Sequence, residues 1–240
     1  VTNLLLHGID TPLVYHDNSL TKDVLNYTDE DKFDVVLMNP PYGGNEKSDV
    51  KSHFPSDMRS SETADLFMVL IMYRLKKNGR AAVIVPDGFL FGADNTKIAI
   101  KTKLLRDFNL HTIIRLPGSI FAPYTSIATN ILFFDNTCAE GAPEGYSTKE
   151  TWFYRLDMPE GYKHFSKTKP MKSEHCDPIR EWWNDRKEII IADGDEKSRC
   201  YSVEDLIATD CNFDLCKFPK EDEEILPPAE LLADYFKKRK

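Results

Sequence analysis

Short apolar runs alternate along the chain with segments whose apolar residues recur at helical spacing. Strands are predicted at the runs bounded by polar residues or proline, namely residues 13–16, 34–38, 81–86, 110–117 and 127–135. Helices are predicted at residues 62–77, which are apolar nearly all round, and from Asp94 or Thr96 to about Phe108. Continuous apolar strands separated by helices indicate an α/β fold whose sheet is mostly parallel and covered on both faces.

The last two of these strands differ from the others in their connection. Only about ten residues, without a helical pattern, separate residues 110–117 from residues 127–135. A parallel crossover needs about a dozen residues or more, so this pair is expected to be antiparallel. The sheet is therefore predicted to end in an antiparallel hairpin.

After residue 135 the composition changes and the apolar runs become shorter. The elements predicted there are a strand at 151–159, a helix at 178–188 and a second helix at 201–209 that Ser202 caps. Residues 1–136 are expected to form a partial catalytic unit. Residues 137–240 are expected to form a C-terminal α+β extension that aromatic side chains hold against the sheet, not a domain of its own.

Both ends of the chain have the pattern of a helix. The segment "TNLLLHG" is typical of the last turns of a helix that closes at Gly8, and another helix is predicted from Pro228 to the C-terminus. A helix end is an unusual beginning for a protein, and the first residue is valine. We therefore expect the sequence to be part of a longer protein.

Charge and cysteine content exclude some classes of protein. The net charge of −8 argues against a protein that grips nucleic acid with its whole surface. Five cysteines without a C-x-x-C pair predict a reduced, cytoplasmic chain without a zinc site, and no apolar run is long enough to span a membrane. Two local basic strips stand out, although a solvated face explains most such strips: Lys163, Lys167, Lys169 and Lys172, and Lys97, Lys101, Lys103, Arg106 and Arg115.

The segment "FDVVLMNPPYGG" places an unusual motif directly after a predicted strand. Ligands of open α/β sheets bind at the carboxyl ends of strands, where Asn39 falls. Pro40 and Pro41 fix two φ angles and remove two N–H donors, which leaves acceptors beside the Tyr42 ring. Such a site suits a planar group with an amino nitrogen, which accepted hydrogen bonds orient while its ring stacks on Tyr42. A proline-rich turn without chemistry is the plain alternative.

The motif "NPPY" after an apolar strand resembles motif IV of the S-adenosylmethionine-dependent amino-methyltransferases. From Thr2 to about Pro219 the chain closely resembles the modification (M) subunit of type I restriction–modification systems, in the segments "NLLLHGI", "FDVVLMNPPYGG", "ADLFMVLIMYRLKKNGRAAVIVPDGFLF", "IRLPGSIFAPYTSIATNILFFD" and "TWFYRLDMPEGYKHFSKTKP". The resemblance implies a methyltransferase-like (Rossmann-like) sheet without its N-terminal strands. It also implies adenine-specific DNA methylation with S-adenosyl-L-methionine.

The resemblance further implies a role for each site residue. Asn39 and the Pro40 carbonyl would accept hydrogen bonds from the amine of an adenine flipped out of the duplex. Tyr42 would stack on that base, and Phe121 matches a second aromatic against it, with a core phenylalanine as the alternative. Asp17 matches the acidic residue that contacts the cofactor's adenine. The implied site is, for catalysis, Asn39, Pro40, Pro41, Tyr42 and Phe121 and, for the cofactor, Asp17 and Asn39.

The sequence departs from the family pattern at the cofactor loop. None of its 11 glycines forms a G-x-G pattern, so that loop is expected to precede Val1. The chain on its own is then expected to keep the base-handling half of the site and to be inactive.

Several partners follow from the resemblance. They are double-stranded DNA, a specificity (S) subunit near the C-terminal helix, a restriction (R) subunit and a possible second M subunit, with no membrane. Two alternatives stay open. One is a methyltransferase that shares NPPY but acts on a glutamine amide or a guanine amine. The other is a non-enzymatic assembly fragment that binds a specificity subunit.

Overall fold

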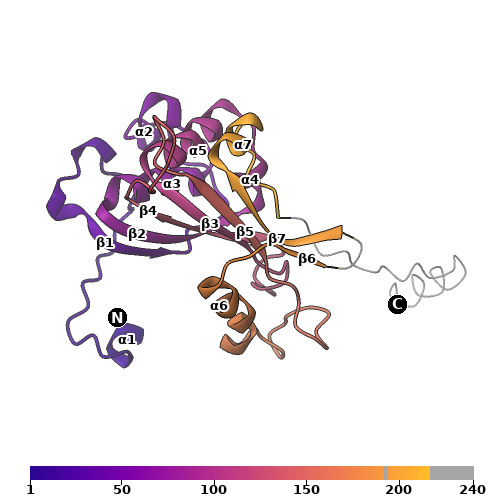
Figure 1. The fold of residues 1–240 in the computed structure, drawn as a ribbon. Coiled ribbons are helices and arrows are strands. Elements are labelled where there is room, and N and C mark those ends of the chain that lie inside the picture. Colours follow the sequence, from indigo (N-terminus) through magenta and orange to yellow (C-terminus); the bar gives the residue numbers. More distant parts are fainter. Residues whose placement is uncertain (192–193, 217–240) are drawn as a thin grey trace, which may run out of the picture.

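A mixed β-sheet organises the chain in the computed structural model, which describes residues 1–191 and 194–216 (Figure 1). In these residues the strand order is β1-β2-β4-β3-β5-β7-β6. The strands are β1 (Phe33–Met38), β2 (Leu75–Pro86), β3 (Asn109–Arg115), β4 (Thr129–Asp135), β5 (Glu150–Arg155), β6 (Ile189–Ile191) and β7 (Asp195–Ser202). The four strands predicted between residues 34 and 135 are therefore confirmed, with β2 longer than its apolar run.

The strand pairing differs from the predicted one in two respects. β3 and β4 are antiparallel, as predicted, but this hairpin lies inside the sheet because β5, β7 and β6 continue beyond β3. Among the described strands only the pairs β1–β2 and β3–β5 are parallel, so the sheet is mixed and contains more antiparallel pairs than the sequence predicts. The reason is that β4 turns back directly after β3 and inserts beside β2.

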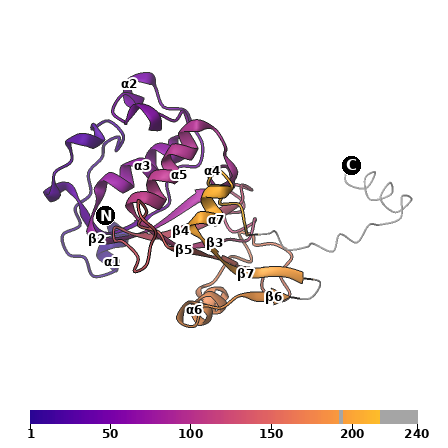
Figure 2. The same cartoon turned by 45° about the horizontal axis from the view of Figure 1, so that its top comes forward.

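Helices cover the two faces of the sheet unequally (Figures 1 and 2). Helices α3, α4, α5 and α7 lie over one face, and α6 lies over the other face near β5 and β7. The helix bounds are α1 (Thr2–Leu6), α2 (Ser48–Lys51), α3 (Thr63–Arg74), α4 (Asp87–Phe91), α5 (Asn95–Asp107), α6 (Asp177–Asn184) and α7 (Val203–Ala208), with 3-10 turns at Val24–Asn26, Asp29–Asp31, Ser56–Met58 and Ser173–Cys176. Helix α3 is apolar all round because it packs between β2 and α5. Within the described residues, none of the helices has the length and apolar character to cross a membrane.

Side-chain caps begin two helices where the sequence predicts them. The Asp94 carboxylate accepts a hydrogen bond of 3.0 Å from the backbone N–H of Lys97, which selects Asp94 over Thr96 as the cap of α5. The Ser202 hydroxyl accepts from the N–H of Asp205 (3.2 Å), and the Asp205 carboxylate accepts from the N–H of Ser202 (3.1 Å). This reciprocal pair is a capping box that begins α7.

The C-terminal third continues the same sheet. Trp182 of α6 packs against Tyr154 and Trp152 of β5, with ring centroids 4.7 Å and 6.0 Å away. Aromatic side chains thus hold α6 on the second face of the sheet. A division of the chain at residue 136 stays a prediction.

Some local predictions are wrong. Residues 13–16 form no strand, because among the described residues no strand lies beside them to complete a hydrogen-bonded ladder. The strand predicted to reach residue 159 ends at Arg155. The prediction that both faces of the sheet are covered fails at β1, where Val36 is buried under α3 but Leu37 is 78% exposed on the opposite face. The helix predicted from Pro228 lies outside the described residues.

Candidate active site

The candidate site lies at one edge of the sheet. β1 and β2 run in the same direction, and β3 runs with them because the antiparallel β4 separates it from β2. Asn39 follows β1, Asp87 follows β2, and the loop with Phe121 follows β3. These segments are distant in the sequence and adjacent in space. They meet at the carboxyl ends of the parallel strands, where the motif predicts a ligand.

The NPPY motif contains an internal hydrogen bond. Asn39 and Pro41 are exposed, Pro40 is buried and Tyr42 is half-buried. The Tyr42 hydroxyl donates to the amide oxygen of Asn39. Partial burial raises the pKa of Tyr42 against the smaller, opposite effect of this hydrogen bond, so the phenol stays protonated and remains a donor. The acceptor predicted to orient an amine is therefore accessible to solvent but engaged by Tyr42.

The structure brings Phe121 next to Tyr42. The two ring centroids are 5.9 Å apart and the ring planes are inclined by 58°, a common geometry for an aromatic pair. Phe121 is half-buried and belongs to neither of the hydrophobic core clusters, which argues against its alternative role as a core residue. A base between two rings needs about 7 Å between their planes, twice a carbon contact distance. The observed pair therefore closes the space that a flipped base would occupy.

A buried polar cluster that no sequence pattern predicted holds the far end of the motif loop. The Gly44 carbonyl accepts hydrogen bonds from the N–H (3.3 Å) and hydroxyl (3.1 Å) of Thr63 at the start of α3. The Lys97 ammonium lies 2.6 Å from a carboxylate oxygen of Glu62 and 2.9 Å from one of Asp65. Burial lowers the pKa of Lys97, but its contacts with Glu62 and Asp65 outweigh burial and raise it, so the ammonium is charged.

A second buried cluster, equally unpredicted, joins the ends of β2, β3 and β4. The Asp87 carboxylate accepts a 2.5 Å hydrogen bond from the Asn130 amide. The Arg115 guanidinium forms an ion pair with Asp214 and lies 3.6 Å from Asp87. This cluster fixes the end of β3 and the start of β4, which the loop containing Phe121 connects. The sequence signal was a charged or amide residue at the end of an apolar run, with Asp87 directly after β2, Arg115 as the last residue of β3 and Asn130 near the start of β4.

One of the two predicted basic strips is wrong. Lys97, Lys101 and Arg115 are only 4%, 0% and 1% exposed, because they lie on the sides of α5 and β3 that face the core. Lys101 donates to the carbonyls of Leu90 (3.1 Å) and Gly92 (2.9 Å), which end α4. The four residues of the other strip are exposed, namely Lys163, Lys167, Lys169 and Lys172.

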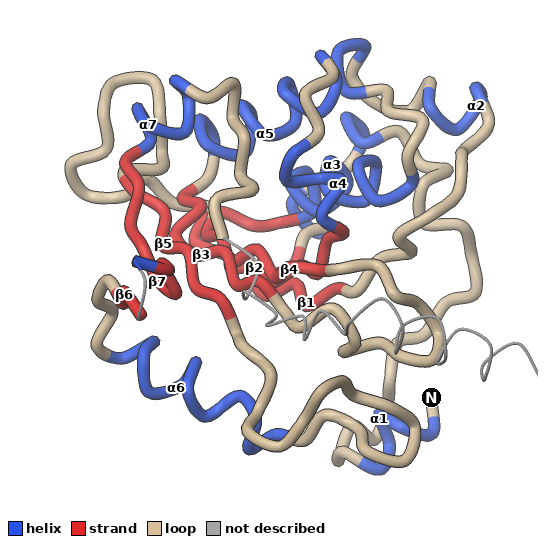
Figure 3. The backbone as a smooth tube through the Cα atoms, turned by 90° about the vertical axis from the view of Figure 1, so that its right-hand side faces the viewer, coloured by secondary structure: helices blue, strands red, loops and turns tan. Residues whose placement is uncertain are grey.

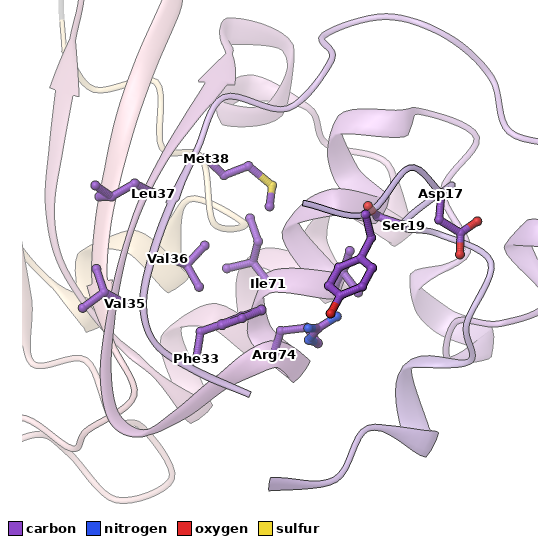
Figure 4. Close-up of a pocket in the computed structure, with 11 residues that line it drawn as sticks. Asp17, Ser19, Phe33, Val35, Val36, Leu37, Met38, Ile71 and Arg74 are labelled. Atoms are coloured by element: carbon purple, nitrogen blue, oxygen red, sulfur yellow. The ribbon is translucent and has the colours of Figure 1, made fainter. Parts of the chain in front are cut away.

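Asp17 lies at a pocket beside the motif (Figure 4). The pocket has a volume of about 480 Å³, and its wall includes the apolar residues of β1 up to Met38, the residue before Asn39. Figure 4 shows Asp17 on the side of the pocket opposite to β1. The exposed Asp17 carboxylate accepts from the N–H of Asn18 (2.7 Å) and keeps further acceptor capacity. A pocket that has an apolar wall and a carboxylate among its lining residues fits an adenine ring with its amino group.

Comparisons with known proteins agree on one family. The family described as N-6 DNA Methylase matches residues 1–225. The chain is 44% identical over 237 residues to the type I restriction enzyme EcoEI methylase subunit of Escherichia coli, covering 98% of this chain and 46% of that protein. It is 32% identical over 219 residues to the EcoKI methylase subunit of Escherichia coli strain K12, covering 81% and 39% respectively.

Solved structures show the same relationship. A crystal structure of a modification subunit of a putative type I restriction enzyme from Vibrio vulnificus has a TM-score of 0.74 and 42% identity, covering 85% of this chain and 40% of that one. A chain from a study of complex assembly and conformational transition in the type I R-M system has a TM-score of 0.75 and 35% identity, covering 99% and 48%.

The fold and the NPPY edge thus define an S-adenosylmethionine-dependent methyltransferase architecture, as the motif predicted. The chain belongs to the N-6 DNA methylase family. It spans less than half the length of the curated relatives named here.

Proposed function

We propose that this chain supplies the base-handling part of a DNA adenine methyltransferase, the modification subunit of a type I restriction–modification system. The observation that supports the proposal most directly is the meeting of Asn39, Tyr42 and Phe121 at the carboxyl edge of the sheet. The substrate would be an adenine extruded from the duplex, because its amine cannot be approached inside the base stack. The names of the relatives do not favour a glutamine or guanine methyltransferase, or an assembly fragment without activity.

The residues of the motif would bind and orient the adenine amine. The Asn39 amide oxygen and the Pro40 carbonyl accept its two N–H groups, which directs the nitrogen lone pair away from the ring plane and toward an incoming methyl group. Before this can happen the Asn39 oxygen must exchange the Tyr42 hydroxyl for the amine. The Tyr42 and Phe121 rings must also separate, so that the base can stack between them.

The cofactor would approach from the side of the Asp17 pocket. S-adenosylmethionine supplies an electrophilic methyl group, and the Asp17 carboxylate would accept a hydrogen bond from the cofactor's adenine amine. The pocket ends at Met38, next to Asn39, so its position is consistent with transfer to an amine held by Asn39. In the absence of a G-x-G loop in this sequence, we propose that other parts of the full-length protein complete the site.

The partners of the full-length protein are part of the proposal. The relatives are methylase subunits of type I restriction enzymes, which supports assembly with a specificity subunit, a restriction subunit and a second modification subunit. Double-stranded DNA is the proposed substrate of that assembly.

The test is an Asn39→Ala variant of the full-length protein, purified with any subunits that accompany it. Losing one preorganised group of this kind costs about 100- to 1000-fold in rate. Methyl transfer to unmethylated DNA, scored as N6-methyladenine by mass spectrometry of the nucleosides, should fall by that factor. Asn45→Ala is the matched control, since Asn45 is an exposed asparagine of the same loop. Activity of Asn39→Ala within a few-fold of wild type would make the motif a simple turn.

A further inference from the structure

A lysine-rich loop lies beside the proposed base site. We define the lysine loop as residues 161–172, which contain Lys163, Lys167, Lys169 and Lys172 and no acidic residue. It follows β5, whose carboxyl end lies at the same edge of the sheet as that of β3, because the two strands are parallel. In Figure 3 the segment between β5 and α6 runs along the side of the sheet that α6 covers.

A direct contact ties the lysine loop to the loop that holds Phe121. The backbone N–H of Phe165 donates to the Ser119 hydroxyl at 2.8 Å, and the Phe165 side chain is 2% exposed. Ser119 is two residues before Phe121. At 3.8 Å between consecutive Cα atoms, the Cα atoms of Lys163 and Lys167 lie no more than about 22 Å from that of Phe121. At 3.4 Å of duplex per base pair, this is about six base pairs.

The lysine loop is held in shape by its own aromatic residues. Phe165 stacks on His175 with ring centroids 5.6 Å apart, and Tyr162 packs edge-on against His175 at 5.0 Å. The Lys169 ammonium lies 3.8 Å from the centre of the Tyr162 ring and donates to the Gly161 carbonyl at 2.8 Å. Lys169 therefore closes the loop on itself, and a fixed loop loses little entropy when its remaining lysines bind a ligand.

The four lysines thus have different surroundings. Lys169 is used within the loop, and Lys172 forms an exposed ion pair with Glu174 at 3.2 Å. Lys163 and Lys167 are exposed and form no ion pair with any residue that the structure describes. Both lie within two residues of the Phe165 anchor.

We propose that Lys163 and Lys167 bind backbone phosphates of the duplex that flanks the extruded adenine, an inference that rests on the proposed function. The chain has a net charge of −8, so its overall field repels DNA and close contact needs local cations. Phosphate contacts of this kind fix the register of a protein on DNA without reading its sequence. Lys163 and Lys167 then position the duplex so that the target base reaches Tyr42 and Phe121.

The experiment uses the full-length protein with its accompanying subunits and compares Lys163→Gln/Lys167→Gln with wild type. Lys77→Gln is the control. Lys77 is an exposed lysine near the start of β2, away from the carboxyl ends of the strands where the proposed base site lies. Binding to a fluorescein-labelled 40-base-pair duplex of mixed sequence is measured between 50 and 200 mM salt. Each lost phosphate contact lowers the slope of log affinity against log salt by about 0.9. Raising the salt concentration fourfold should therefore weaken the binding of the double variant by a factor about 12 times smaller than the factor by which it weakens the binding of wild type.

Three outcomes overturn the proposal. They are an unchanged salt slope in the double variant, an equal change in Lys77→Gln, and a Lys163→Arg/Lys167→Arg protein that loses the slope although its charge is kept. A defect in the binding of a protein subunit, with an unchanged slope, would assign the lysines to an acidic protein surface instead. Methylation of long PCR-amplified DNA, measured over a range of DNA concentrations, separates this test from the proposed function. The glutamine variant should need more DNA than wild type to reach half of its own maximal rate, whereas a wild-type protein that never methylates DNA would refute the function itself.

Discussion

Removing the Tyr42 hydroxyl should strengthen the binding of the target base. In the described structure this hydroxyl donates to the Asn39 amide oxygen, which is the atom proposed to accept the adenine amine. The base therefore has to break an existing hydrogen bond before it can form its own. Tyr42→Phe keeps the ring for stacking and leaves the exposed Asn39 oxygen to water, which exchanges readily.

The size of the effect follows from the one hydrogen bond that changes. A net intramolecular hydrogen bond contributes about 0.5–1.5 kcal/mol, which corresponds to about a 2- to 13-fold change in a binding constant. Tyr42→Phe should strengthen base binding by up to that factor, with the maximal rate kept. Tyr42→Ala removes stacking worth about 1–3 kcal/mol and should weaken base binding by about 5- to 150-fold.

The assay is the fluorescence of 2-aminopurine at the target position, which rises when the base leaves the stack, measured with the full-length protein and its subunits. Titration with DNA gives the affinity of the flipped state for wild type, Tyr42→Phe and Tyr42→Ala. Methylation at saturating DNA gives the maximal rate of each. If Tyr42→Phe is as damaging as Tyr42→Ala in both measurements, the hydroxyl acts in the reaction and the competition between Tyr42 and the base does not exist.

Two further predictions concern the buried cations, and urea unfolding checks both. Lys97→Met leaves the buried Asp65 without its cationic partner and should cost about 3–5 kcal/mol of stability. Lys103→Met, which removes a surface ion pair, should cost less than about 1 kcal/mol. Equal losses in the two variants would contradict the role of burial. Burial lowers the pKa of Lys101 from 10.5 to about 8. At pH values between these two, the unfolded chain binds more protons than the folded chain, so the free energy of unfolding should rise with pH. Lys101→Met should lack that rise. Parallel pH profiles of the variant and wild type would contradict the lowered pKa of Lys101.

The sequence predicted the parts of the site that lie within one segment. Asn39, Pro40 and Tyr42 follow an apolar strand in a short motif, so their proximity is dictated by the covalent chain. Phe121 lies 79 residues after Tyr42, and the resemblance to a family, not any local pattern, predicted that they would be neighbours. The distance of 5.9 Å between their rings confirms the proximity. Their stacking on a base stays a prediction.

The errors in the predicted fold have a common physical origin. The apolar pattern shows which residues favour burial, but it shows neither which strands pair nor whether another element covers each face of a strand. The apolar run of β1 gives the clearest case. Five apolar residues in six predicted burial on both faces, yet Phe33, Val35 and Leu37 are exposed and only Val36 is buried among the described residues. The same limitation explains why β5, β7 and β6 were not predicted to extend the sheet.

The positions of the cations change what the net charge implies about DNA. Lys97, Arg115 and Arg155 are buried and paired with carboxylates, and Lys101 is buried against backbone carbonyls. Such charges are shielded by their partners and contribute little to the field outside the protein. The carboxylates that do not pair remain at the surface with the exposed lysines.

A face of this chain that binds DNA would therefore have to be local. For this reason four lysines gathered in one loop, which is tied to Ser119, favour DNA binding more than the same four charges scattered over the surface would. Because the proposed contacts with phosphate would carry no sequence information, recognition of a particular DNA sequence would have to come from another part of the assembly, in line with the proposed specificity subunit.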